Sequence, residues 1–216
     1  MEIIQGKNTR QIGAEELALC MTGYHDVLLD LGTGDGRFVL QTAKSSPSMY
    51  VIGLDACREN LVEGSRNAPK NALFVIAGAE NLPPELYGQA SRLTINFPWG
   101  SMLRGLLEGG MGLLESLSQA AQPKAELEVR LNASALHEAG WELDPGAERV
   151  AEVLAASGFQ LSKPLRLGPT DLRNTHTTWA KRLAFGRDPR AYAISGRKIH
   201  SQIPVFAGRQ LAYAAD

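Results

Sequence analysis

The sequence predicts an α/β fold with a mostly parallel sheet. Three short apolar runs, residues 27–31, 51–55 and 73–76, alternate with segments of helical spacing. The order strand, helix, strand, helix, strand implies right-handed crossovers, which place the strands in parallel in one sheet. A chain of 216 residues, of which 44% are hydrophobic, is long enough to build one such domain around a full core.

The remaining elements are expected from local patterns. Gly6, Lys7 and Asn8 separate two short strand-like segments and predict a β-hairpin, and Gly158 is expected to end a helix. In chain order, the expected elements are a hairpin within residues 1–13, a helix over 14–21, a strand over 27–31 with a helix to about 43, a strand over 51–55, a helix over 57–67, strands over 73–76 and 93–97, helices over 102–107 and 111–121, a strand over 127–131, helices over 133–140 and 145–156, and strands over 160–167 and 191–195. No role is assigned to the tail, residues 199–216.

An acidic, glycine-rich loop follows the first of these parallel strands. Gly32, Gly34 and Gly36 have the spacing G-x-G-x-G and allow the backbone to take positive φ and to approach a ligand closely. A dinucleotide-binding loop has the spacing G-x-G-x-x-G instead. Asp30 and Asp35 add negative charge where a pyrophosphate needs none, so the loop favours a cation. S-adenosylmethionine carries a sulfonium and an ammonium group, and we expect it to be the ligand.

A second carboxylate indicates a nucleoside in that ligand. Asp55 ends the second apolar run, 23 positions after Gly32. At that offset an acid at the tip of the second strand accepts hydrogen bonds from ribose hydroxyls. A glycine loop with such an acid also suits NAD, and a tight turn with two solvated aspartates is a third interpretation.

Two later loops are expected at the same edge of the sheet, because ligands of doubly wound sheets bind at the carboxyl ends of the strands. Residues 77–83 are small enough to leave room for a flat adenine, and Glu80 either faces that adenine or caps the next turn. Trp99 follows the strand 93–97 between a proline and a glycine. There its ring either stacks on a planar substrate or packs over the loop.

The net charge of −1 does not suggest nucleic acid as a partner, but the distribution of charge does. Between residues 163 and 209 there are ten basic and two acidic residues, whereas the rest of the chain holds 12 basic and 21 acidic residues. Such asymmetry is typical of an electrostatic footprint for phosphates, although a solvated basic face is the alternative.

The segment 175–187 lies within this basic region. Trp179 and Leu183 are four positions apart on an expected helix, which alone indicates a packed face. An aromatic residue among basic residues is also typical of RNA binding, in which rings stack on bases and guanidinium groups hold phosphates. The basic residues in and just beyond the segment are Lys181, Arg182, Arg187 and Arg190.

Other classes of protein are disfavoured. No apolar run is long enough to span a membrane, and the N-terminal residues lack the pattern of a signal peptide, so we expect a cytoplasmic protein. Cys20 and Cys57 have no metal or redox spacing, and the four histidines do not cluster. No metal site is expected.

Three stretches together resemble one family. Residues 30–37 (DLGTGDGR), 97–101 (FPWGS) and 178–187 (TWAKRLAFGR) closely resemble the aminoglycoside-resistance 16S ribosomal RNA (adenine 1408-N1)-methyltransferases. The resemblance covers residues 1–198 and implies a single class I, Rossmann-like, S-adenosylmethionine-dependent methyltransferase domain. It implies a seven-stranded sheet, an N-terminal hairpin and an insert, residues 168–190, between the last two strands. It also implies the small ribosomal subunit as the partner.

The resemblance assigns roles to individual residues. Trp99 and Trp179 match two tryptophans that hold a flipped adenine, and Thr177 stands near the target base. The residues expected to bind the cofactor are Asp30, Gly32, Thr33, Gly34, Asp55, Ala79, Glu80 and Ser101. The residues expected to contact RNA are Lys181, Arg182, Arg187 and Arg190.

The chain departs from the family in two linkers, and other functions stay open. The linker between the strand expected over 127–131 and the helix that follows it is short. Residues 65–72 keep only Arg66 and Lys70 where relatives carry a longer lysine-rich stretch. Residues 96–99 loosely resemble the Asn-Pro-Pro-aromatic motif of adenine N6 methyltransferases, and tRNA guanine-N7 enzymes share a Phe-Pro element. A non-catalytic RNA-binding or assembly factor that keeps a relic of the cofactor fold is a further alternative, which a measurement of S-adenosylmethionine binding distinguishes.

Overall fold

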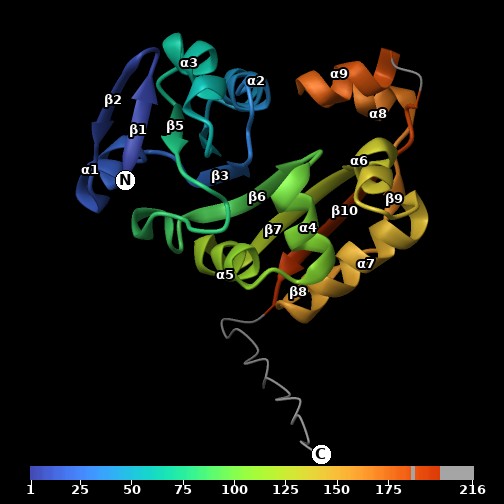
Figure 1. Cartoon of the computed structure of the whole chain (residues 1–216). Helices are drawn as coiled ribbons and strands as arrows, with labels where there is room; N and C mark the ends of the chain where they lie inside the picture. The colour runs from blue at the N-terminus through green and yellow to red at the C-terminus, as the bar shows by residue number, and fades with distance from the viewer. Residues whose placement is uncertain (186–187, 200–216) are drawn as a thin grey trace, which may run out of the picture.

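The computed structural model describes residues 1–185 and 188–199, the side chains of Trp179 and of residues 183–185 excepted. Figure 1 shows one twisted sheet with helices on both of its faces. The strands are β1 Glu2–Gln5, β2 Asn8–Gln11, β3 Asp26–Leu31, β4 Met49–Asp55, β5 Ala72–Ile76, β6 Ala90–Asn96, β7 Ala121–Asn132, β8 Phe159–Leu161, β9 Leu165–Arg166 and β10 Ala191–Lys198. The helices are α1 Ala14–Cys20, α2 Arg37–Ser45, α3 Arg58–Arg66, α4 Gly100–Glu108, α5 Met111–Ala120, α6 Ala133–Glu138, α7 Leu143–Ala156, α8 Pro169–Asn174 and α9 Thr178–Phe185, with a 3₁₀ turn at Pro84–Leu86.

The centre of the sheet is parallel, and the expected α/β class is confirmed. The strands lie in the order β2-β1-β5-β4-β3-β6-β7-β10-β8, and β9 also pairs with β10. The pairs from β5 to β7 are parallel, whereas β10 runs antiparallel to β7, β8 and β9. The strand order reverses between β3 and β6, so their carboxyl ends, at Leu31 and Asn96, form the crevice in which such sheets bind ligands.

Alternate residues of the parallel strands face two apolar layers. Leu28 and Phe74 pack with Val39 of α2 on one face of the sheet. Leu29 and Leu54 belong to the larger core on the other face, which α1, α4, α5 and α7 complete. Because both faces of the central strands are covered, their sequences read as continuous apolar runs.

The strand count differs from the expected seven for two reasons. The predicted hairpin is present and joins the sheet, because β1 pairs with β5 at Ile3 and Val75. The strand expected over 160–167 is divided into β8 and β9. Pro164 has no N–H to donate to the ladder, and pairing with β10 resumes only at Leu165. Ten strands therefore make up the sheet within the described part of the chain.

The insert forms α8 and α9 between β9 and β10. Figure 1 shows both helices at the upper right, beyond the end of the sheet, with α2 at the same height. A helix through residues 179–183 was expected and is confirmed. The last strand is longer than expected, since β10 continues to Lys198 by pairing with β7 and β8. Apart from its first residue, the tail assigned to 199–216 lies outside the described residues.

Candidate active site

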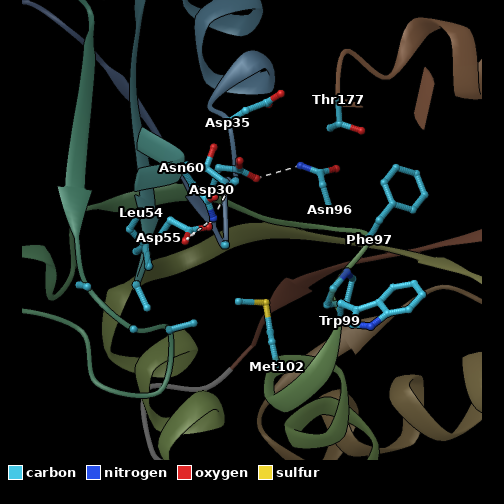
Figure 2. A pocket seen from close by; sticks show the side chains of 18 of the residues that line it. Asp30, Asp35, Leu54, Asp55, Asn60, Asn96, Phe97, Trp99, Met102 and Thr177 are labelled. Carbon is cyan, nitrogen blue, oxygen red and sulfur yellow. Dashed lines mark hydrogen bonds between the residues drawn. The ribbon is translucent and has the colours of Figure 1, made fainter. Parts of the chain in front are cut away.

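A cavity of about 470 Å³ opens at the carboxyl ends of β3, β4 and β6. It lies at the reversal of strand order, where the topology places a ligand site. The eight residues expected to bind the cofactor all line it, as do Trp99 and Thr177. Figure 2 shows Asp30 and Asp55 on one side of this cavity and Phe97 and Trp99 on the other.

The glycine loop turns tightly because three of its residues have positive φ. The φ angles of Gly32, Gly34 and Gly36 are 70°, 57° and 73°, a region that residues with a Cβ rarely adopt. At Gly36 a Cβ would also lie 2.4 Å from Cε1 of the Phe74 ring. The loop therefore depends on glycine both for its backbone and for its packing.

Asp55 is held against this loop by three donors. Its Oδ2 accepts a hydrogen bond from the Gly34 N–H at 2.9 Å. Its Oδ1 accepts from the Cys57 N–H at 2.9 Å and from Asn60 Nδ2 at 3.2 Å. The carboxylate is thereby fixed at the end of β4 and lines the cavity with a known orientation.

Asp30 is the most buried acid of the site, with 1% of its surface exposed. Thr94 Oγ1 and Asn96 Nδ2 donate to its Oδ1 at 2.7 Å and 2.8 Å, and Figure 2 shows the bond from Asn96. Burial raises the pKa of Asp30 to about 6, although these hydrogen bonds and the Arg130 charge oppose the shift. A cationic ligand would stabilise the ionised form and lower this pKa.

Asn96 is itself oriented by Arg130, which lies opposite it on β7. Arg130 Nη1 donates to Asn96 Oδ1 at 2.6 Å, while its Nη2 forms an ion pair with Glu128 at 2.8 Å. The amide oxygen of Asn96 is therefore occupied, and its nitrogen points at Asp30. The positive charge of Arg130 therefore lies near Asp30, with only the Asn96 side chain between them.

The loop after β5 contributes Ala79 and Glu80 to the same cavity. Ser101 Oγ, on the first turn of α4, donates to Glu80 Oε1 at 3.2 Å. Ala79 is 3% exposed, so its small side chain forms part of the wall. Thr33, which is also buried, forms another part of the wall next to Asp30.

Trp99 reaches the cavity because the chain reverses direction after β6. Phe97 has a φ of 53°, which is unusual for a bulky residue and indicates a locally strained turn. Its ring is buried among Leu172 and Ala180 of the insert. The turn leaves Trp99 37% exposed at the cavity wall, where its indole N–H donates to Glu138 Oε1 at 3.2 Å.

The insert is tied to the glycine loop. The Thr178 hydroxyl donates to Asp35 Oδ2 across the cavity mouth. Thr177 Oγ1 accepts from the Ala180 N–H at 2.8 Å, which caps the first turn of α9, and Thr177 also lines the cavity. Trp179 lies in this same turn, but its side chain is outside what the structure describes.

Two of the residues expected to contact RNA line different grooves, Lys181 beside α2 and Arg190 beside Trp99. Lys181 and Arg182 are exposed on α9, whereas Arg187 lies outside the described residues. Arg190 forms a two-point ion pair with Asp188, at 2.8 Å for both Nε–Oδ1 and Nη2–Oδ2. Their contacts with RNA stay predictions.

Sequence reasoning assigned no role to several residues that shape the site. Asn60 follows Asp55 by five positions, which is a weak signal for a hydrogen bond across the strand end. The sequence holds no signal for the contacts of Arg130 or Glu138, because both depend on how distant segments pair in the fold.

Among the described residues, no group of three or more His, Cys, Asp or Glu side chains is arranged to hold a metal ion. In the same part of the chain, no helix has the length and apolar character needed to cross a membrane.

A glycine loop and two acids at the switch point of a mostly parallel sheet are typical of the class I methyltransferases. Within that class, the family model for NpmA, 16S rRNA (adenine(1408)-N(1))-methyltransferase, matches residues 2–198. The chain belongs to this family.

Individual relatives agree with the family match. The chain is 31% identical over 214 residues to the 16S rRNA (adenine(1408)-N(1))-methyltransferase of Escherichia coli, covering 91% of this chain and 98% of the relative. It is 33% identical over 204 residues to the enzyme of the same name from Streptoalloteichus hindustanus, covering 87% and 94%.

Solved structures give the same result at the level of the fold. The 16S rRNA methyltransferase KamB has a TM-score of 0.84 at 30% identity, over 93% of this chain and all of that one. A variant of the 16S rRNA (adenine(1408)-N(1))-methyltransferase from Catenulisporales acidiphilia, solved with its cosubstrate S-adenosylmethionine, has a TM-score of 0.80 at 26% identity, over 95% of this chain and all of that one.

Proposed function

We propose that this protein transfers the methyl group of S-adenosylmethionine to N1 of adenine 1408 in the 16S rRNA of the small ribosomal subunit. The observation that carries the proposal is that one cavity joins an acidic, glycine-lined half to a half walled by Trp99. The names of the relatives in the same family support the choice of base and atom. Because ribosomal subunits are cytoplasmic, we also propose that the protein is located in the cytoplasm.

The acidic half of the cavity fits the methyl donor. Asp30 and Asp55 supply negative charge for a ligand with an ammonium and a sulfonium group. No atom lies within 4 Å of the position that a Cβ on Gly34 would take, so a ligand can approach the backbone closely there, whereas Met102 occupies the corresponding space beside Gly32. When bound there, S-adenosylmethionine supplies an electrophilic methyl group.

The other half of the cavity suits a base that has left its helix. An enzyme that modifies a base atom inside a duplex must first extrude the base, which costs a few kcal/mol. Stacking on an aromatic ring returns about 1–3 kcal/mol per base. Trp99 offers its ring at the cavity wall, and Glu138 limits the rotation of that ring by accepting the indole N–H. Trp179 is the proposed second stacking residue.

The reaction itself needs no general base. N1 of adenine carries a free lone pair at neutral pH, and that pair forms the new N–C bond while the C–S bond breaks in line. The electron pair of the C–S bond stays on sulfur, which becomes a neutral thioether, and the positive charge moves to the methylated adenine. No proton is transferred, so the protein contributes chiefly by positioning the two reactants. The face of Trp99 also attracts the cationic product ring.

A methyl group and a positive charge at this base would obstruct aminoglycosides that bind the decoding region. Several structurally similar proteins are named as antibiotic-resistance or aminoglycoside-resistance methyltransferases. We therefore propose that the protein confers resistance of that kind, which growth of a sensitive bacterium expressing the gene in the presence of kanamycin or apramycin tests.

A tryptophan substitution tests the stacking role. Trp99→Ala should abolish methylation of purified small subunits while S-adenosylmethionine binds with nearly unchanged affinity in calorimetry, because the indole lies on the target side of the cavity. Trp99→Phe keeps a ring and should retain part of the activity. Full activity of Trp99→Ala would show that the base is held in another way.

A further inference from the structure

A second groove, of about 550 Å³, lies between α2 and the insert. Arg37 and Lys44 line it from α2, and Arg173, His176 and Lys181 line it from the insert. All five side chains are exposed. Thr177 lines both this groove and the active-site cavity, so the two lie next to each other. In Figure 1, α2 and α9 face each other above the sheet.

The groove is strongly basic. Its lining includes four lysine and arginine side chains and no acidic residue among those that the structure describes. Arg37 Nε lies 3.3 Å from Asp35 Oδ2, but that carboxylate also accepts the Thr178 hydroxyl. Within the described part of the chain, Lys44 and Lys181 form no ion pair.

These positive charges repel one another, and their repulsion destabilises the fold. The repulsion is relieved when an anion enters the groove. Arg37 and Lys44 are seven residues apart on one helix, a rise of about 10 Å. At that separation the two cations can reach different phosphates of one nucleic-acid strand.

We propose that this groove binds the phosphate backbone of the RNA strand that flanks the target base. The inference rests on the proposed function, because the base that enters the cavity brings its own strand to the cavity mouth at Thr177. It assigns Arg37, Lys44, Arg173 and His176 to the RNA-binding surface. These phosphate contacts hold the strand in register and carry no information about its sequence.

Two charge reversals test the proposal without touching the active-site cavity. Neither Lys44 nor Arg173 lines that cavity, so Lys44→Glu, Arg173→Glu and the double variant should bind S-adenosylmethionine as the wild type does. The matched control is Lys124→Glu, since Lys124 is exposed near the start of β7, at the end of that strand opposite to the one at which the cavity opens.

The measurement is the affinity of each variant for purified, unmethylated small ribosomal subunits at several salt concentrations. The logarithm of the binding constant falls with the logarithm of the salt concentration by about 0.9 per phosphate contact. At about 0.15 M salt each contact therefore raises the affinity about fivefold. The double variant should bind about 25-fold more weakly or worse, with a slope lower by about two. The KM for subunits should rise in parallel while kcat stays unchanged, and the control should match the wild type.

Equal binding of subunits by the double variant and the wild type would overturn the inference. Primer extension with the wild type tests the proposed function separately, so the two failures are distinguishable. Lys44→Gln and Arg173→Gln provide a second test that remains valid if the reversals disturb folding, since each should lower the salt slope by about one. Unchanged slopes in both would contradict the proposal.

Discussion

Asp30→Asn is expected to stabilise the ligand-free protein and at the same time to weaken its binding of S-adenosylmethionine. The carboxylate is almost fully buried, and burial raises its pKa from 3.8 to about 6. In the folded state near pH 7 it is therefore ionised at a cost. An asparagine keeps an oxygen that can accept from Thr94 and Asn96, yet carries no charge to desolvate.

The size of the effect follows from the pKa. A shift of about two units corresponds to about 3 kcal/mol. The folded state binds the proton more tightly than the unfolded state, so this group lowers stability as the pH rises through about 4 to 6, and the whole penalty is present above that range. For a chain of this length, about 3 kcal/mol corresponds to a rise in Tm of about 6–12 °C.

Thermal unfolding of the wild type and Asp30→Asn without ligand, near pH 7 and near pH 5, measures this difference. About half of the stabilisation should remain near pH 5, because wild-type Asp30 is then mostly protonated in the folded state. Calorimetry should show S-adenosylmethionine binding weakened by about 10- to 150-fold, the worth of a charged hydrogen bond. A variant no more stable than the wild type near pH 7, or equally stabilised at both pH values, would refute the reasoning.

Two pairs of substitutions test the local geometry. Gly36→Ala should lower the free energy of unfolding in urea by about 3 kcal/mol, because its Cβ meets Phe74 at a residue with positive φ. Gly34→Ala has open space around its Cβ and should lower that free energy by only about 1 kcal/mol. Equal losses of stability in the two variants would contradict this account. Glu138→Ala should reduce kcat/KM for subunits by about tenfold, which is the contribution of one hydrogen bond that positions Trp99. Glu138→Gln keeps an acceptor and should reduce kcat/KM less. An unchanged kcat/KM in Glu138→Ala would show that the bond has no role.

The parallel core could be predicted from sequence because its signals are local. The apolar runs that became β3, β4 and β5 are bounded by glycines, acids and turns, and each was placed within two residues of its observed bounds. The cavity residues were predicted for a related reason. In a doubly wound sheet the loops that follow β3, β4, β5 and β6 must meet at one edge.

One feature that was missed had a local signal. The strand expected over 160–167 is divided into β8 and β9, and Pro164 within that range is a local indication of the break. The other missed features depend on long-range pairing. The orientation of Asn96 could be predicted only with the register that places Arg130 opposite it on the neighbouring strand β7. The contact between Trp99 and Glu138 joins segments 39 positions apart, and no periodicity in either segment indicates it.

Primer extension across the decoding region of 16S rRNA tests the central claim most directly. Small subunits are incubated with the protein and S-adenosylmethionine, and a methyl group on N1 blocks the Watson–Crick edge of the base. Reverse transcriptase should therefore stop one nucleotide before adenine 1408, and only when the methyl donor is present. Incorporation of methyl groups without that stop would indicate another atom or another base, and no incorporation at all would contradict the proposed function.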